Sequence, residues 1–212
     1  MGISAAQVKE LRDKTGAGMM DCKAALKETD GDMEKAVDHL RKAGVLKAAK
    51  RAERATGQGI ISSYVHAGSK LAVLVEVNCE TDFVAKTDLF QQFARDVAMH
   101  VAAQNPLVVQ REDLPPDALE RERAIYKEQA LASGKPENIV DKIVDGKIGK
   151  YYSEVCLLEQ PFVKDTDITV GDLLTQTIAT LGENCRIARF VRVEVGGNAP
   201  KSEEEASGAC CV

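Results

Sequence analysis

The spacing of apolar residues changes between residues 70 and 103, and this change constrains the fold more than any other feature of the chain. Every second residue over 71–77 is apolar, as in a β-strand with one buried face. Apolar residues then recur at intervals of three and four, which predicts an amphipathic helix over residues 86–103. The helical positions are Phe90, Phe93, Ala94, Val97 and Val101. Because the apolar face of a strand needs a cover, we expect the helix to pack on it.

Two further β-rich segments extend this unit. Residues 60–66 are expected to form a hairpin with residues 70–78. Residues 186–195 are predicted as a closing strand that places one alternating set of side chains on a single face. That set is Ile187, Arg189, Val191, Val193 and Val195.

Helical segments lie between the hairpin and the closing strand. They are predicted over residues 116–132, from residue 136 towards residue 158, and over residues 170–181. The order of strands and helices indicates an α+β fold in which helices pack on a small antiparallel sheet of three strands.

The first 45 residues predict three short helices. Ser4 followed by Gln7 is a capping box, and Gly16 is suited to end the helix that follows. A second helix is expected over residues 19–28, and a third from about residue 31 to Gly44. Helices this short bury little apolar surface, so we expect a marginally stable docking unit and not a catalytic one.

Changes in composition suggest four parts. We predict a three-helix docking domain over residues 1–45, a basic helical linker over 46–56, and an α+β core that also dimerises over 57–196. Residues 197–212 have no apolar periodicity, so a disordered tail is predicted.

Several classes of protein are disfavoured by the composition. No apolar run approaches the length of a membrane span and the N-terminus lacks a signal sequence, so we expect a cytoplasmic protein. The six cysteines have no metal-ligand spacing and are interpreted as reduced thiols. There is no phosphate-binding loop, dinucleotide fingerprint or catalytic constellation, so we predict no cofactor, no bound metal and no enzymatic activity.

A basic segment, residues 41–54, stands out in a chain whose net charge is −5. Its Lys and Arg residues recur at helical spacing without interleaved aromatic residues. The segment fits either a solvated, partner-facing helix or a nucleic-acid site. The acidic balance of the whole chain favours the helix and argues against direct nucleic-acid binding.

The corner segment, residues 81–84, lies where the second strand passes into the helix. Thr81 or Asp82 is suited to cap the helix. Phe83 and Val84 are expected either to turn inward as a hydrophobic staple or to project as an anchor for a partner. Burial of apolar surface alone favours the staple.

A second motif carries two adjacent methionines. Met19 and Met20 follow a glycine-containing loop, and Lys23 lies one helical turn further on. The methionines fit either an adaptable contact surface or the core of a small helical bundle, and the sequence does not decide between these.

Both motifs resemble the signature regions of elongation factor Ts. The resemblance is carried by residues 8–12, 15–22 and 78–86 in the expected order, and it extends through residues 139–163 and the closing strand. It implies a ubiquitin-associated-like N-terminal domain and a non-enzymatic factor that exchanges guanine nucleotide on elongation factor Tu. Both the GDP-bound and the nucleotide-free forms of elongation factor Tu are implied partners.

The resemblance also implies roles for particular residues. In this family the corner segment enters the nucleotide domain of elongation factor Tu and displaces magnesium. The resemblance therefore implies that Phe83 projects towards the partner and does not turn inward. The implied residues of this site are Thr81, Asp82, Phe83 and Val84. The implied docking residues on the same partner domain are Arg12, Met19, Met20 and Lys23.

The chain is similar to the short form of the family. It is expected to lack the duplicated core half and the inserted helical hairpin of longer members. A single core half leaves sheet edges and apolar surface uncovered, so we expect a homodimer and a two-plus-two assembly with elongation factor Tu. The competing interpretations are a binding adaptor without exchange activity, a nucleic-acid binder and an enzyme that uses Cys22 or Cys79.

Overall fold

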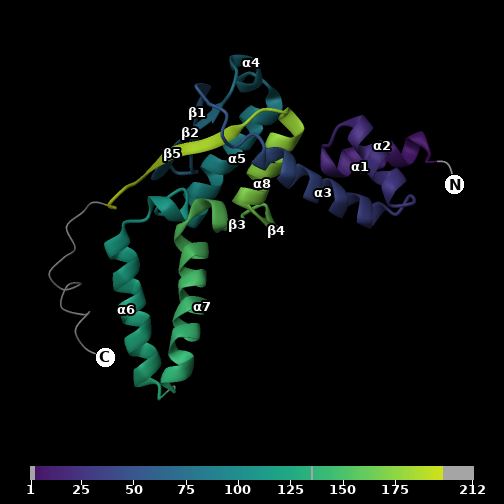
Figure 1. The fold of residues 1–212 in the computed structure, drawn as a ribbon. Coiled ribbons are helices and arrows are strands. Elements are labelled where there is room, and N and C mark those ends of the chain that lie inside the picture. The colour runs from purple at the N-terminus through teal and green to yellow at the C-terminus, as the bar shows by residue number, and fades with distance from the viewer. Residues whose placement is uncertain (1–2, 135, 198–212) are drawn as a thin grey trace.

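The N-terminal helices follow from their caps. The computed structural model describes residues 3–134 and 136–197 (Figure 1). Helix α1 (Ala5–Thr15) begins after Ser4, whose hydroxyl accepts a hydrogen bond from the Gln7 N–H at 3.2 Å. It ends at Gly16 in the left-handed conformation, and α2 (Met19–Glu28) spans the predicted residues. The capping-box prediction is confirmed.

Helix α3 (Met33–Ala49) is longer than expected. Asp32 caps its first turn, but the helix continues through Gly44 to Ala49, so the prediction that it stops at the glycine was wrong. Gly44 lies against α8 (Val170–Leu181), where an added methyl group would come within 3.4 Å of Ala179. The glycine therefore permits close packing of two helices and does not end one. The predicted linker, residues 46–56, is helical only as far as Ala49.

The three N-terminal helices share a small apolar cluster. Its buried members are Val8, Leu11, Cys22, Ala25, Leu26 and Ala36. Helix α3 also contacts α8 of the core, so the N-terminal unit is attached along this helix. The division at residues 45 and 56 remains a prediction.

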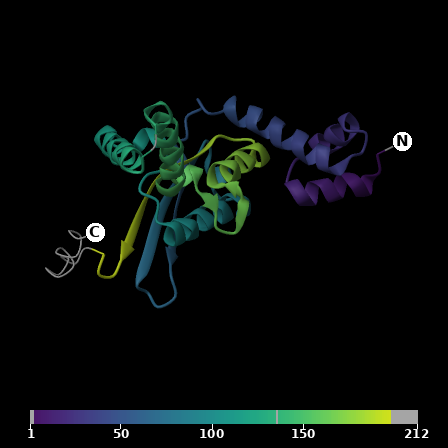
Figure 2. The same ribbon diagram turned by 90° about the horizontal axis from the view of Figure 1, so that it is seen from below.

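An antiparallel sheet organises the core, in the strand order β1–β2–β5. The strands are β1 (Gln58–Val65), β2 (Leu71–Cys79) and β5 (Cys185–Glu194). Helix α5 (Asp88–Gln104) packs against β1 and β2, and α8 packs on α5, so both helices lie on one side of the sheet (Figures 1 and 2). The predicted α+β fold and the helix cover are confirmed.

The closing strand contains a β-bulge that changes which residues face outward. Val77 pairs with Ile187, whereas Glu76 pairs with Arg189, so Ala188 is the extra residue. A bulge shifts the alternation of side chains by one position. Ile187 is therefore buried while Val191 is exposed, and the prediction of a single face shared by Ile187, Arg189 and the three later valines was wrong.

Two long helices project from the core as an antiparallel hairpin (Figure 1). They are α6 (Pro116–Ala132) and α7 (Glu137–Val155), and the 3₁₀ turns Arg111–Asp113 and Leu157–Glu159 flank them. The pair has its own apolar cluster of Ala130, Val140, Val144 and Ile148. Both helices were predicted, but the expectation that the chain lacks a helical hairpin was wrong.

The remaining elements complete the core. The short strands β3 (Pro161–Phe162) and β4 (Asp165–Thr169) pair with each other and lead into α8, which Thr169 caps. None of the described helices is long and apolar enough to span a membrane. Most of the predicted tail, residues 198–212, lies outside the described residues.

Candidate partner-binding site

The corner segment forms its own short helix between β2 and α5. Helix α4 (Asp82–Ala85) begins after Thr81, whose hydroxyl accepts a hydrogen bond from the Val84 N–H at 3.4 Å. A second cap at Thr87 then starts α5, so the longer helix begins later than predicted. The chain changes direction before α4 and again before α5, so α4 lies at an exposed corner of the core (Figure 1).

The two apolar residues of the corner segment point in different directions. Phe83 is 78% exposed, whereas Val84 is partly buried and packs against the main core cluster. Phe83 therefore projects, against the expectation from burial alone, whereas Val84 turns inward. An isolated aromatic side chain on a capped corner is suited to enter a cavity on a partner.

Asp82 lies beside Phe83 and remains charged. Its carboxylate accepts a hydrogen bond from Lys86 Nζ at 2.7 Å, and this bond lowers the pKa of Asp82 below its usual range. Both side chains are well exposed, so the ion pair contributes little to stability. The corner therefore presents an exposed carboxylate and an exposed aromatic ring at consecutive positions.

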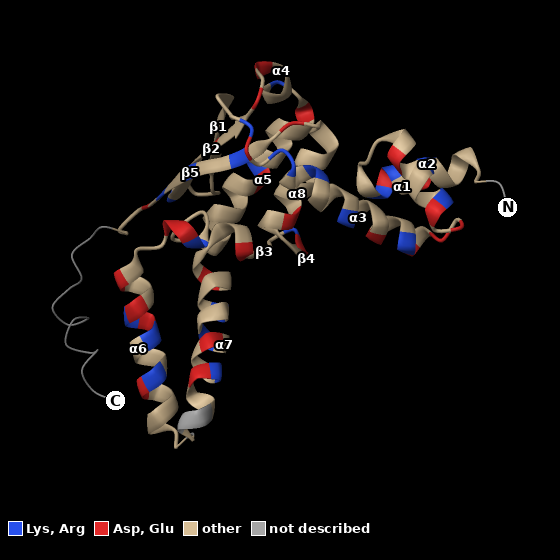
Figure 3. Ribbon diagram, viewed as in Figure 1, with Lys and Arg blue, Asp and Glu red and all other residues tan. Residues whose placement is uncertain are grey.

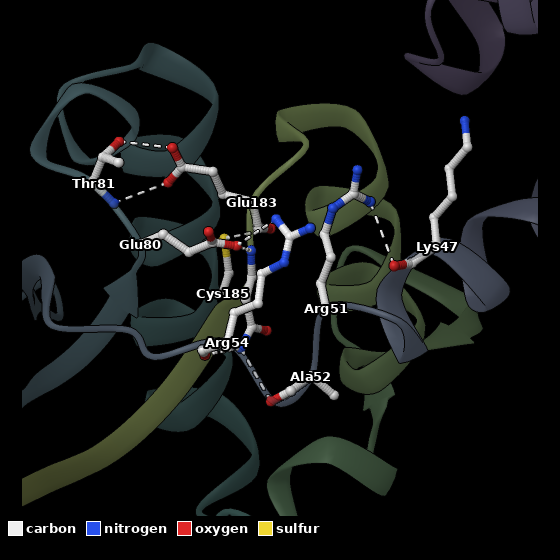
Figure 4. A network of polar contacts seen from close by, with 9 residues as sticks. Lys47, Arg51, Ala52, Arg54, Glu80, Thr81, Glu183 and Cys185 are labelled. Carbon is white, nitrogen blue, oxygen red and sulfur yellow. Dashed lines mark hydrogen bonds and ion pairs between the residues drawn. The ribbon is translucent and has the colours of Figure 1, made fainter.

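Polar contacts beneath the corner come from a distant part of the sequence. Figure 4 shows Glu183 bound to Thr81, and Glu80 close to the turn that precedes β5. Sequence analysis did not identify Glu183 or Asn184 as functional candidates. The only local signal was Gly182, which ends α8 in the left-handed conformation and starts this turn.

The predicted docking residues lie at the surface of the N-terminal unit. Met20 is 75% exposed and Met19 is 46% exposed, which excludes the alternative that both pack in the bundle core. Arg12, in the last turn of α1, and Lys23, on α2, are also exposed. Cys22 and Leu26 occupy the inward positions of α2 instead.

The structure does not bring the two groups of predicted site residues together. Helix α4 lies at the top of the core in Figure 1, whereas α1 and α2 lie beyond α8 and α3. A partner that contacts both groups must therefore extend over a wide surface. The sequence motifs define two separate contact regions and not one pocket.

Half of the six basic side chains in the basic segment, residues 41–54, pair with acidic residues of the same chain. Arg41 pairs with Asp172 on α8, Lys47 with Asp21 on α2, and Arg54 with Glu80 near the corner. Figure 3 shows basic and acidic residues interspersed along α3. These contacts favour a role in joining the parts of the molecule over the nucleic-acid alternative.

A cleft of about 330 Å³ lies between the N-terminal helices and α8. Gly44 of α3 faces Ala179 here, and the ion pair between Arg41 and Asp172 spans the two elements at 3.2 Å. No charged side chain lining the cleft is buried. We interpret the cleft as the junction of the N-terminal unit with the core.

Cysteine chemistry is disfavoured by burial. Cys22, Cys79, Cys156 and Cys185 are free, buried thiols, as expected; Cys210 and Cys211 lie outside the described residues. Burial raises the pKa of Cys79, that of Cys156 to about 11 and that of Cys185 to about 12, so these groups stay protonated near neutral pH. Within residues 3–134 and 136–197, no cluster of His, Cys, Asp and Glu is arranged to hold a metal ion.

The outer face of the sheet carries several apolar side chains that are exposed within the described part of the chain. Because of the bulge in β5, Val191 lies opposite Leu74, and Val193 lies opposite Ala72 on the same face. The exposed apolar residues of this outer face are Ile61, Val65, Leu74, Val191 and Val193. Exposed apolar side chains gathered on one face are suited to contact another protein surface.

Comparisons with known proteins agree on one family. The family model described as Elongation factor TS matches residues 8–197. A protein named elongation factor Ts from Desulfosudis oleivorans is 62% identical over 194 residues, covering 92% of this chain and 98% of the relative. Proteins of the same name from Geotalea uraniireducens and Carboxydothermus hydrogenoformans are each 57% identical. They cover 97% and 96% of this chain, and 95% and 94% of their own lengths.

Proposed function

The chain belongs to the elongation factor Ts family, and we propose that it releases GDP from elongation factor Tu by inserting its corner segment beside the bound magnesium ion and phosphates. Elongation factor Ts is a nucleotide exchange factor, so the chain acts in translation elongation. It does so in the cytoplasm and without covalent chemistry. The observation that carries the proposal is the exposed Phe83 at a corner whose neighbour Val84 is anchored in the core.

The mechanism depends on the relative affinities of the factor for the GDP-bound and the nucleotide-free forms of elongation factor Tu. A GTPase holds GDP through backbone amides, a lysine and a bridging magnesium ion. An exchange factor must therefore bind the nucleotide-free form more tightly than the GDP-bound form. Because this coupling is reciprocal, GDP weakens binding of the factor by the same ratio.

Each residue of the corner segment has a separate task in this mechanism. Phe83 fills an apolar site in the nucleotide domain, and the Asp82 carboxylate adds negative charge where phosphates and a hard cation are held. Thr81 caps α4 and Val84 anchors it, so they hold the first two in place. The ring would occupy space beside the nucleotide and the carboxylate would repel the phosphates of GDP, so together they would favour the nucleotide-free arrangement.

Phe83 alone does not supply the required energy. Burying one Phe side chain contributes about 1.5–3 kcal/mol, whereas reversing a two-state equilibrium from 1:99 to 99:1 requires about 5.5 kcal/mol. A second contact region is therefore needed. The exposed N-terminal residues provide it on the same partner domain, and they are Arg12, Met19, Met20 and Lys23.

The test is a measurement of nucleotide release. Elongation factor Tu is loaded with fluorescent GDP, and its release into excess unlabelled GDP is followed with and without catalytic amounts of this protein. Acceleration supports the exchange function. Binding to elongation factor Tu without acceleration contradicts it and leaves the adaptor as the better account.

We also propose that two copies of the chain pair through the outer face of the sheet, giving a two-plus-two assembly with elongation factor Tu. This surface has apolar side chains from all three strands, including Ile61, Leu74 and Val191. A second copy offers a matching surface about a two-fold axis. Burial of both faces removes the exposed apolar area.

A charged residue at the centre of the outer face tests this pairing. Leu74→Glu is expected to raise the dimer dissociation constant at least about a hundredfold, because an unpaired buried charge costs several kcal/mol. Leu131→Glu, at the exposed end of α6, is the matched control and is expected to remain dimeric. Sedimentation equilibrium gives the measurement, and a monomeric unmodified chain at micromolar concentration contradicts the proposal.

A further inference from the structure

Every backbone and side-chain polar group of Thr81 has a hydrogen-bond partner. One carboxylate oxygen of Glu183 accepts from the Thr81 N–H at 3.0 Å and the other from the Thr81 hydroxyl at 2.7 Å (Figure 4). The Thr81 carbonyl accepts from the Cys79 thiol at 3.1 Å. The residue at which the corner segment begins is therefore held at three points. Two of them are charge-assisted bonds, which are stronger than neutral ones.

A second set of contacts passes through Asn184, which is buried. Its backbone N–H donates to Glu80 Oε1 at 2.6 Å. Its side-chain amide donates to the carbonyls of Ala52, at 3.3 Å, and Arg54, at 2.8 Å. Asn184 thus connects the residue before Thr81 with the chain that leaves α3.

The turn that presents these side chains is itself constrained. Gly182 ends α8 with a φ of 78°, and Cys185 begins β5 directly after Asn184. Glu183 lies 102 residues from Thr81 in sequence, so the contact joins segments that only the tertiary fold brings together. The support beneath the corner is part of the core and not of the corner itself.

We propose that Glu183 and Asn184 are positioning residues for nucleotide exchange. Glu183 fixes the orientation of the corner segment, and Asn184 ties it to residues 52–54 behind the N-terminal unit. The proposal rests on the exchange function proposed above. A segment that must enter its partner in one orientation loses less conformational freedom on binding when it is held in that orientation beforehand.

Substitutions at Glu183 separate positioning from general stability. Glu183→Ala removes both bonds to Thr81 and is expected to lower the kcat of exchange about tenfold, with KM changed less than about twofold, because hydrogen bonds to charged groups are the stronger class. Glu183→Gln retains one acceptor and one donor that fit the N–H and the hydroxyl of Thr81. It is expected to restore most of the activity.

Asn184 is tested in the same way with an isosteric change. Asn184→Asp cannot donate to the carbonyls of Ala52 and Arg54, and it adds a negative charge next to Glu80. We expect kcat to fall about threefold to tenfold, since neutral hydrogen bonds contribute about 0.5–1.5 kcal/mol and the added charge is repelled. The matched control is Glu159→Ala, which breaks the ion pair with Arg111 away from the corner.

The mobility of the corner provides a readout that needs no partner. The chain contains no Trp, so Phe83→Trp places a single indole on the corner segment. Its time-resolved anisotropy is measured in the free protein, while exchange kinetics are measured with Phe83 intact. Glu183→Ala and Asn184→Asp are expected to add fast local motion of the indole, and Glu159→Ala is not.

The outcomes distinguish the two proposals. Faster indole motion together with a lower kcat and rescue by Glu183→Gln supports the positioning role. Unchanged motion or unchanged kcat in Glu183→Ala overturns it, and so does an equal loss of kcat in Glu159→Ala. If the unmodified chain fails to accelerate GDP release, the exchange function itself is overturned, and the positioning role with it.

Discussion

The N-terminal unit and the corner present exposed apolar side chains from very different supports. Met20 projects from a regular helix in a unit whose buried cluster is small, built around Leu11 and Leu26. Phe83 projects from a four-residue helix that Val84 anchors in the main core and that Glu183 holds from below. Met20 depends on a small cluster within three helices, whereas the corner is held by the main core and by contacts with a distant turn.

This difference matches the two tasks of the proposed mechanism, which are docking to elongation factor Tu and displacement of its magnesium ion. Docking needs contact area and tolerates local motion, because the partner fixes the geometry on binding. Displacement of a magnesium ion needs a group held in one orientation before contact. We therefore expect the N-terminal unit to govern affinity and the corner to govern the rate of GDP release.

The largest expected effect concerns the stability of the N-terminal unit. Leu26→Ala leaves a cavity in the small cluster and is expected to cost about 2–5 kcal/mol. Hydrogen exchange, read by mass spectrometry, should show lost protection in α1 and α2 while α5 keeps its protection. Met20→Ala on the same helix is the control and should leave protection unchanged. Equal loss in α5 contradicts the separation of the two supports.

The next effect concerns the corner. Phe83→Ala is expected to lower the kcat of exchange about tenfold to a hundredfold, from the apolar burial that is lost in the complex. Binding to nucleotide-free elongation factor Tu should remain detectable by calorimetry. Leu89→Ala removes another exposed apolar side chain close in sequence and should leave kcat within about twofold. Complete loss of binding on Phe83→Ala contradicts the proposal that the N-terminal unit governs affinity and the corner governs the rate of GDP release.

A smaller effect is expected from the docking surface. Met20→Ala removes part of an apolar contact worth about 1 kcal/mol, so KM should rise about fivefold while kcat changes little. Steady-state exchange at varied concentrations of GDP-bound elongation factor Tu gives both constants. A lower kcat at unchanged KM would mean that Met20 acts on the rate of GDP release, which contradicts its proposed role in docking.

The smallest effect is a dependence of core stability on pH. His100 is buried. Its Nδ1 accepts a hydrogen bond from the Val163 N–H, so its Nε2 carries the proton and donates to Gln160 Oε1. Burial lowers the pKa of His100 from the ordinary value of about 6.5. As pH falls below about 6.5 the unfolded chain takes up the proton first, so the free energy of unfolding decreases. Denaturant titrations of the core between about pH 7.5 and pH 5 measure this.

The control for the pH effect is an exposed histidine. His66→Gln should keep the same dependence on pH, whereas His100→Gln should reduce it while lowering stability throughout. An unchanged pH dependence in His100→Gln contradicts the assignment. Because His100 lies on α5, this effect reports on the core and not on the N-terminal unit.

Local patterns in the sequence predicted most of the elements. The capping box at Ser4, the alternation in β2 and the period of α5 are short-range signals, and the structure confirms all three. The class of the fold followed from their order. The exposure of Phe83 did not follow from the rule that large apolar residues are buried; its proposed contact with a partner accounts for the exception.

The features that sequence analysis missed depend on contacts between distant segments. The bulge at Ala188 is defined only by pairing with β2, and Gly44 continues a helix because α8 lies against it. The hairpin of α6 and α7 required knowledge that two predicted helices pack on each other. Glu183 acquires its candidate role from a residue 102 positions away, for which the chain carries no local pattern.

The most direct test of the central claim is a single titration that compares Phe83→Ala, Met20→Ala and the double variant. Exchange of fluorescent GDP is measured over a full range of elongation factor Tu concentrations to separate kcat from KM. We predict that Phe83→Ala lowers kcat alone and Met20→Ala raises KM alone. The double variant should show both changes at their single-variant sizes. If either single change alters both constants equally, the corner and the N-terminal unit do not divide rate from affinity, and the account is contradicted.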